Sequence, residues 1–120
     1  MYRSFEELEV WKRGCKLAVD VYLALKDSRE FGLKDQMNRA AVSIPSNIAE
    51  GAERDSVKEF IHFLHIAKGS AAELRTQIYR AEKIGSLTPQ ITKPLIAETK
   101  ELSAMLHGLI NSKTPKSKSS

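Results

Sequence analysis

The stretch from residue 36 to residue 51 constrains the fold of this chain more than any other part of it. Apolar residues recur there on one helical face, and most positions between them carry small side chains. Small side chains let a neighbouring backbone approach closely, so we expect this helix to be surrounded by other helices. Pro45 lies within it, where it removes one backbone hydrogen bond and should bend the axis. The apolar stripe consists of Leu33, Met37, Ala40, Ala41, Ile44 and Ile48.

Helix-capping signals divide the first half of the chain into two predicted helices. Ser4 begins a capping box that should start the first helix, which ends near Lys26. The second helix should run from about residue 33 to residue 50, with Gly51 as a natural C-terminal stop. Gly14 in the first helix permits a close contact with a neighbouring helix. The 3,4 spacing of the first helix predicts a buried stripe of Leu8, Trp11, Cys15, Ala18, Tyr22 and Leu25.

The second half of the chain has the same organisation. Ser56 begins another capping box, and Gly85 should end the third helix. Pro89 opens the fourth helix at the favoured first position, whereas Pro94 should bend or fray the first turn. The heptad positions of the third helix are Phe60, Leu64, Ala67, Ala71, Leu74, Ile78 and Ala81. The apolar positions of the fourth helix are Ile91, Leu95, Leu102, Met105, Leu106 and Leu109.

These elements predict an all-α protein, because short connections between amphipathic helices favour an up-and-down antiparallel four-helix bundle. The bundle should occupy residues 1–112, followed by a disordered Lys/Ser-rich tail over residues 113–120. That tail holds three of the 19 lysines and arginines and none of the 15 acidic residues, so most of the net charge of +4 belongs to it. The sequence has no apolar run long enough for a membrane span and no apolar signal region, so we expect a cytoplasmic protein that contacts no membrane.

Extra apolar residues predict contacts beyond the monomer. A bundle helix needs one apolar stripe, and two of the predicted helices carry additional apolar positions. A wide stripe can also fill the core of a monomer, but the pattern favours an oligomer. The residues that lie off the predicted stripes are Val10, Val19 and Val21 in the first helix and Ile61, Phe63, Ile66 and Tyr79 in the third.

No residues in the sequence have the spacing of a catalytic or cofactor site. Glu59 and His62 match the E-x-x-H motif of di-iron bundles, which requires a second copy that the chain lacks. His62 and His65 could hold one metal ion loosely or contact a phosphate, although a solvated pair is the simpler interpretation. Cys15, the one cysteine, is better explained as a buried thiol than as a nucleophile. We therefore predict a protein that is not an enzyme, with no metal, cofactor or small-molecule substrate.

Basic residues provide the candidate contacts with nucleic acid. Charged side chains also cover helical surfaces for solubility, so position alone does not assign them a role. Arg39 and Arg54 could meet phosphates, but with Asn47 and Glu50 they could instead form a structural hydrogen-bond network. The acidic residues interleaved with them favour the structural interpretation. The candidate RNA-contacting residues are Lys12, Arg13, Lys16, Arg39, Arg54, Lys68, Arg75 and Arg80.

Several segments together resemble the S23 family of four-helix-bundle proteins, the 23S rRNA intervening-sequence proteins. The segment from Gln36 to Gly51 is the most specific of them. The resemblance covers nearly the whole chain except the tail. The other matching segments are 8–12, 58–60, 66–70, 73–77 and 105–110, together with Arg54.

The resemblance implies a bundle that assembles into a ring-like homopentamer. It also implies a link to RNA, because members of the family are encoded within intervening sequences of large-subunit ribosomal RNA genes. A related group comprises the accessory proteins of diversity-generating retroelements, in which a basic pentamer contacts a reverse transcriptase and nucleic acid. The nearly neutral charge outside the tail and the presence of Pro94 both depart from that group.

Residues and resemblance together predict a non-catalytic homo-oligomer that binds RNA or a ribonucleoprotein partner. The expected partners are further copies of the chain and RNA or a nucleic-acid-processing protein. The alternative is an oligomeric scaffold for protein–protein interactions with no nucleic-acid binding of its own. Positive charge clustered on one face would favour RNA, whereas a large exposed apolar groove would favour the scaffold.

Overall fold

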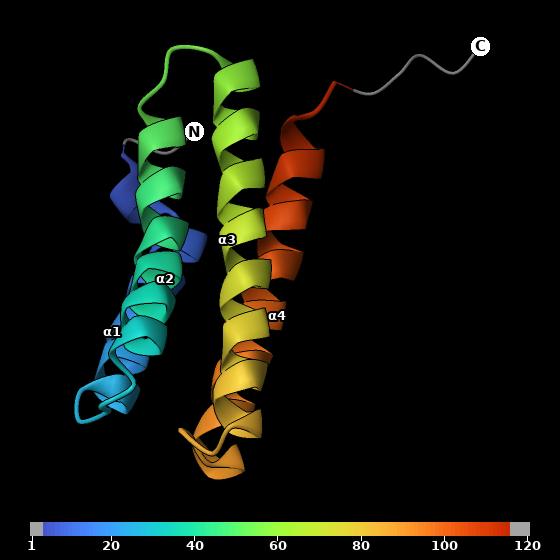
Figure 1. Ribbon diagram of the computed structural model, residues 1–120. Helices are drawn as coiled ribbons and strands as arrows, with labels where there is room; N and C mark the ends of the chain where they lie inside the picture. The colour runs from blue at the N-terminus through green and yellow to red at the C-terminus, as the bar shows by residue number, and fades with distance from the viewer. Residues whose placement is uncertain (1–3, 116–120) are drawn as a thin grey trace.

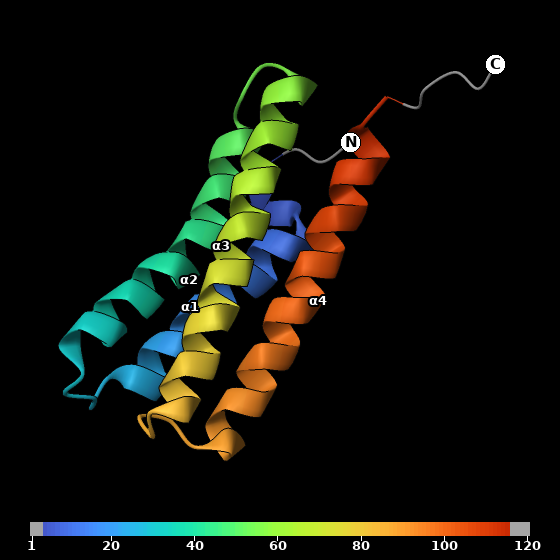
Figure 2. The ribbon, with the colours of Figure 1, turned by 45° about the vertical axis from the view of Figure 1, so that its right-hand side comes forward.

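The computed structural model describes residues 4–115, which form four α-helices that run alternately up and down (Figure 1). Each helix packs against the next in the chain, and α4 completes the bundle by contacting α1 over a shorter stretch (Figure 2). This arrangement confirms the predicted all-α up-and-down bundle. The elements are η1 (a 3₁₀ turn, Phe5–Glu7), α1 (Glu9–Leu25), α2 (Phe31–Ala52), α3 (Val57–Lys83) and α4 (Pro89–Lys113).

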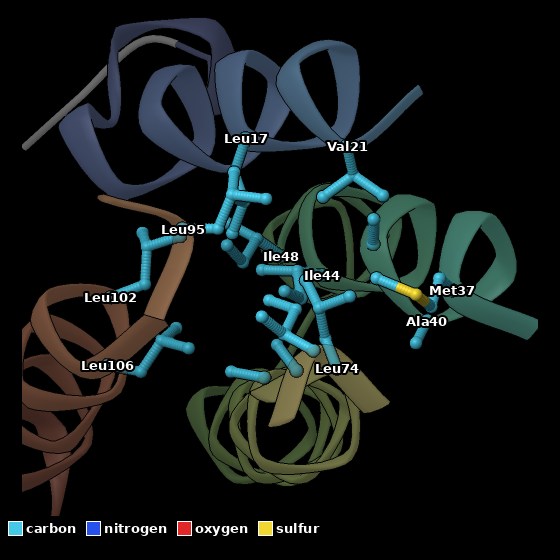
Figure 3. Close-up of a cluster of buried hydrophobic side chains, with 14 of the residues drawn as sticks. Leu17, Val21, Met37, Ala40, Ile44, Ile48, Leu74, Leu95, Leu102 and Leu106 are labelled. Carbon is cyan, nitrogen blue, oxygen red and sulfur yellow. The ribbon is translucent and has the colours of Figure 1, made fainter. Parts of the chain in front are cut away.

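The hydrophobic core lies between the four helices, and all of them contribute side chains to it (Figure 3). The stripes predicted for α2 and α3 are confirmed, since every member of both is buried. Ile44, Ile48 and Leu74 have no exposed surface. Burying one such side chain stabilises the fold by about 1.5–3 kcal/mol.

The buried face of α1 differs from the predicted one. The core positions are Val10, Gly14, Leu17, Val21 and Leu25, so only Leu25 of the predicted stripe is fully buried. Tyr22 is 56% exposed, and Cys15 is half-buried at the edge of the core. Val10 and Val21, predicted as subunit contacts, instead belong to the monomer core. The prediction failed because α1 is apolar on two adjacent faces, and periodicity cannot say which of them meets α2.

Packing against α2 decides which face of α1 is buried. A Cβ atom added at Gly14 would lie 3.4 Å from side-chain atoms of both Ile44 and Pro45. This confirms the close helix contact predicted at Gly14. It also explains why Pro45 is buried within α2, where its ring faces α1 instead of water.

The ends of α1 and α2 correct two predictions. Ser4 caps the 3₁₀ turn η1, and α1 begins only at Glu9, because Leu8 is extended between them. The Phe5 ring packs edge-on against Trp11, with 5.2 Å between the ring centroids. Helix α2 continues through Gly51 to Ala52, so this glycine does not stop the helix.

Gly51 instead allows α2 to approach α3. A Cβ atom added there would lie 2.6 Å from Cβ of Phe63 and 3.1 Å from Cδ1 of Phe60. The stop and start signals of α3 are as predicted: the Ser56 hydroxyl accepts a hydrogen bond from the backbone N–H of Glu59. At the other end, Gly85 adopts a φ of +81°, which favours glycine.

Helix α4 buries two threonines that hydropathy alone does not place in a core. Thr92 and Thr99 are fully buried, and their hydroxyls donate hydrogen bonds to Glu82 and to the carbonyl oxygen of Ile96, respectively. Ile91 is 41% exposed, contrary to prediction, while the helix is continuous through Pro94 and its first turn is not frayed. The buried face comprises Thr92, Leu95, Thr99, Leu102, Leu106 and Ile110, with Met105 and Leu109 half-buried beside it.

The C-terminal end of α4 lies one residue beyond the predicted domain boundary. The helix ends at Lys113, whose ammonium group lies 5.2 Å from the centroid of the Phe60 ring. Residues 116–120 of the predicted tail lie outside the described residues. Within the described part of the chain, no helix combines the length and apolar character needed to cross a membrane.

Candidate nucleic-acid interface

The eight candidate basic residues fall into two groups: those that form ion pairs with acidic side chains of the described residues and those that form none. Arg13 extends from α1 to α4, where it forms a two-pronged pair with Glu98 at 2.6 and 2.9 Å and approaches Glu101 at 3.8 Å. The hydrogen bond to Glu98 raises the pKa of Arg13. The guanidinium group is thus engaged in holding α1 to α4.

Three more of these cations form ion pairs within one helix or across a helix end. Lys16 lies 2.9 Å from Asp20, and Arg39 lies 3.2 Å from Asp35, both at the i,i+4 spacing. Arg54 pairs with Glu50 at 2.9 Å, and its guanidinium group lies 4.8 Å above the Phe63 ring. Such exposed pairs contribute little to stability, but they lower the local positive charge.

The predicted polar network is divided between two places. Asn47 donates hydrogen bonds to the carbonyl and hydroxyl oxygens of Ser43, and the Ser43 hydroxyl lies 2.8 Å from that of Ser70 on α3. This group links α2 to α3 midway along the helices. Glu50 pairs with Arg54 beyond it, and no hydrogen bond joins the two groups among the described residues. Asn47 therefore lies in a hydrogen-bonded group that includes neither Arg39 nor Glu50.

Lys12 and Arg80 are exposed and have no ion pair with any described residue. Lys12 lies on the outer side of α1, and Arg80 lies about 140° around α3 from Arg75, on the side away from α4. Lys12 is one turn from Lys16 on α1, which does not contact α3, so neither Lys12 nor Arg80 adjoins Lys68 or Arg75.

Lys68 and Arg75 belong to a basic surface that the sequence prediction only partly included. They are seven residues apart on α3, and Lys93, Lys100 and His107 repeat at the same interval on α4. Seven residues are almost two helical turns, so each set lies on one side of its helix. We define the α3–α4 face by the residues Lys68, Arg75, Lys83, Lys93, Lys100 and His107.

Two contacts fix the register of this face. Nζ of Lys68 lies 3.2 Å from Nδ1 of His107, and the Thr92 hydroxyl donates a 2.6 Å hydrogen bond to Glu82. Because α3 and α4 are antiparallel and lie side by side in both ribbon views (Figures 1 and 2), Arg75 is level with Lys100. Lys68 and Arg75 on α3 and Lys93 and Lys100 on α4 therefore form two parallel rows with steps of about 10 Å.

Acidic residues are sparse on the α3–α4 face. Glu98 and Glu101 of α4 point toward α1, where they meet Arg13. Glu82 lies between the helices and accepts the hydrogen bond of the buried Thr92 hydroxyl. Of the described residues, none forms an ion pair with the lysines and arginine of this face. The lysines and arginine of the face thus have no ion-pair partner within residues 4–115, and Glu82 is the acidic side chain that adjoins them.

The sequence prediction missed Lys93, Lys100 and His107. Their signal was the seven-residue repeat, which follows the leucine stripe of α4 at a constant offset. Seeing it as one surface required knowing which side of α4 meets α3. His62 and His65 are exposed as predicted, and the described residues bring no three His, Cys, Asp or Glu side chains together as a metal site.

Cys15 does not have the environment of an activated nucleophile. It is half-buried, and burial raises the pKa of its thiol. A raised pKa keeps the thiol protonated, whereas a reactive cysteine needs a lowered one.

Comparison with known proteins identifies the family. A family model described as 23S rRNA-intervening sequence protein matches residues 6–108. The chain belongs to this family. A crystal structure of a protein of unknown function from the S23 ribosomal protein family of Bacteroides thetaiotaomicron VPI-5482 is similar, with a TM-score of 0.80 and 23% sequence identity. The match covers 84% of this chain and 97% of that one, and it shows a common fold. No curated protein sequence matches the chain.

Proposed function

We propose that this protein is a non-catalytic, homo-oligomeric member of its family that binds RNA through the α3–α4 face. The observation that carries the proposal is the double row of cations without local acidic partners. Phosphate contacts from lysine and arginine supply most of the sequence-independent affinity for nucleic acids. The family description, which refers to 23S rRNA, supports RNA as the nucleic acid.

Exposed apolar residues on the outer side of α1 support self-association. Val19, Tyr22 and Leu23 are each more than half exposed, and Val42 of α2 is exposed to the same degree. A helix that is apolar on its outer side as well as in the core is typical of one that meets another subunit. An oligomer, for which the resemblance implies five subunits, would repeat the α3–α4 face and strengthen RNA binding by multivalency.

The proposal predicts a steep dependence of affinity on salt. The α3–α4 face carries five lysine and arginine side chains. If all five contact phosphates, a double-logarithmic plot of affinity against salt should have a slope of about −3 to −5 per protomer. A single incidental contact would give a slope near −1.

The test is a salt series of binding to a structured fragment of 23S rRNA. We would compare the full chain with a chain that ends at Pro115, because the structure places Lys113 in α4 and against Phe60. The proposal predicts a steep slope that is nearly the same for both chains. Binding that is absent, or that disappears with residues 116–120, would contradict it.

The second candidate function is an oligomeric scaffold for a protein partner. The exposed apolar residues of α1 favour it, because such residues also serve protein interfaces. The same salt series separates the two functions, since a scaffold predicts no binding of the RNA fragment by the folded part of the chain.

A further inference from the structure

Tyr79 is an exposed aromatic residue in the middle of the α3–α4 face. It is 47% exposed, its hydroxyl forms no side-chain hydrogen bond with a described residue, and its ring makes no stacking or cation–ring contact with one. A tyrosine in a monomer core normally buries its ring and hydrogen-bonds its hydroxyl. The stability of the bundle therefore does not explain the position of this ring.

The cations of the face surround Tyr79. Arg75 and Lys83 lie one helical turn before it and after it on α3, on the same side of the helix. The register set by the Lys68–His107 and Glu82–Thr92 contacts places Tyr79 level with Ile96 of α4. Lys93 and Lys100 lie about one turn on either side of that level, and Ile96 is half-buried against the core.

We propose that Tyr79 stacks on an unpaired base of single-stranded RNA while the four surrounding cations hold the adjacent phosphates. This inference rests on the proposed function and names the form of RNA that the face prefers. An aromatic ring within a positively charged groove is a stacking platform for single strands. In an A-form duplex the bases are paired and stacked on one another, so the ring has no free base face to meet.

The experiment measures the affinity of the full-length protein for an oligouridine strand and for a fully paired RNA duplex of the same length. Tyr79→Ala removes the ring, Tyr79→Phe keeps it, and Phe31→Ala removes an exposed aromatic ring from the start of α2. Stacking predicts that Tyr79→Ala weakens binding of the single strand about 5- to 150-fold and leaves duplex binding nearly unchanged. Tyr79→Phe and Phe31→Ala should both bind like the unmodified protein.

Three results would overturn the inference. Tyr79→Ala could bind the single strand with unchanged affinity, or it could weaken duplex binding to the same extent. It could also change the oligomeric state in light scattering, which would place Tyr79 in a subunit interface. If the unmodified protein binds neither RNA, the proposed function itself fails. If the unmodified protein binds RNA in a salt-dependent way and Tyr79→Ala does not change the affinity, the proposed function stands and only the stacking contact is refuted.

Discussion

Gly51 tests the packing of α2 against α3. The Cβ atom of an alanine at this position would lie 2.6 Å from Cβ of Phe63 and 3.3 Å from the carbonyl oxygen of Phe60. Both atoms belong to or adjoin the α3 backbone, so rotation of a flexible side chain cannot relieve the clash. Gly51→Ala should therefore force α2 and α3 apart.

The magnitude follows from two opposing effects. Overpacking of this kind costs about 1–3 kcal/mol. Replacing glycine by alanine within a helix gains about 1 kcal/mol. Gly69 of α3 provides a matched control, because an added Cβ atom there meets no atom within 4 Å and only the gain applies. Gly51→Ala should thus be about 1–3 kcal/mol less stable than Gly69→Ala.

The assay is urea unfolding followed by circular dichroism, with both variants at the same protomer concentration. Equal concentration matters because association of subunits adds to the apparent stability. A free energy of unfolding for Gly51→Ala that equals or exceeds that of Gly69→Ala would refute the close approach of α2 and α3 at this glycine.

Two further predictions concern the core and its edge. Ile48→Asp buries an unpaired charge at a fully buried position and should unfold the protein, whereas Gln36→Asp on the exposed side of α2 should shift stability by no more than about 0.5 kcal/mol; thermal melts of both distinguish these outcomes. Cys15 should react with iodoacetamide at pH 8 more slowly in the folded protein than in urea, because burial raises the pKa of its thiol; equal rates would show that the thiol is not shielded.

The stripes of α2 and α3 could be predicted from sequence because each helix has a single apolar face. The buried stripe of α1 could not be predicted from sequence, because this helix has two adjacent apolar faces. Val10, Leu17 and Val21 are each followed directly by another apolar residue, namely Trp11, Ala18 and Tyr22, so both sets have the same helical spacing. The choice between these faces depends on the contact of Gly14 with Pro45, which joins residues far apart in the chain. Local periodicity contains no information about such a contact.

The candidate site was predictable only in part for a related reason. Lys68 and Arg75 were identified as exposed cations, but the same criterion selected Arg13 and Lys16, which the structure places in ion pairs. Pairing between Arg13 and Glu98 depends on how α4 packs beside α1. Conversely, Lys100 became a candidate only once the structure showed that it lies beside Arg75 across the α3–α4 pair.

The most direct test of RNA binding by the α3–α4 face is a comparison of two charge reversals. Arg75→Glu with Lys100→Glu alters the face, and Arg29→Glu with Arg80→Glu makes the same change of charge at exposed positions elsewhere. The account predicts that the first pair weakens binding to the 23S rRNA fragment at least about tenfold and reduces the salt slope by about 2, while the second pair has little effect. Equal losses from both pairs, or a loss from the second pair alone, would contradict it.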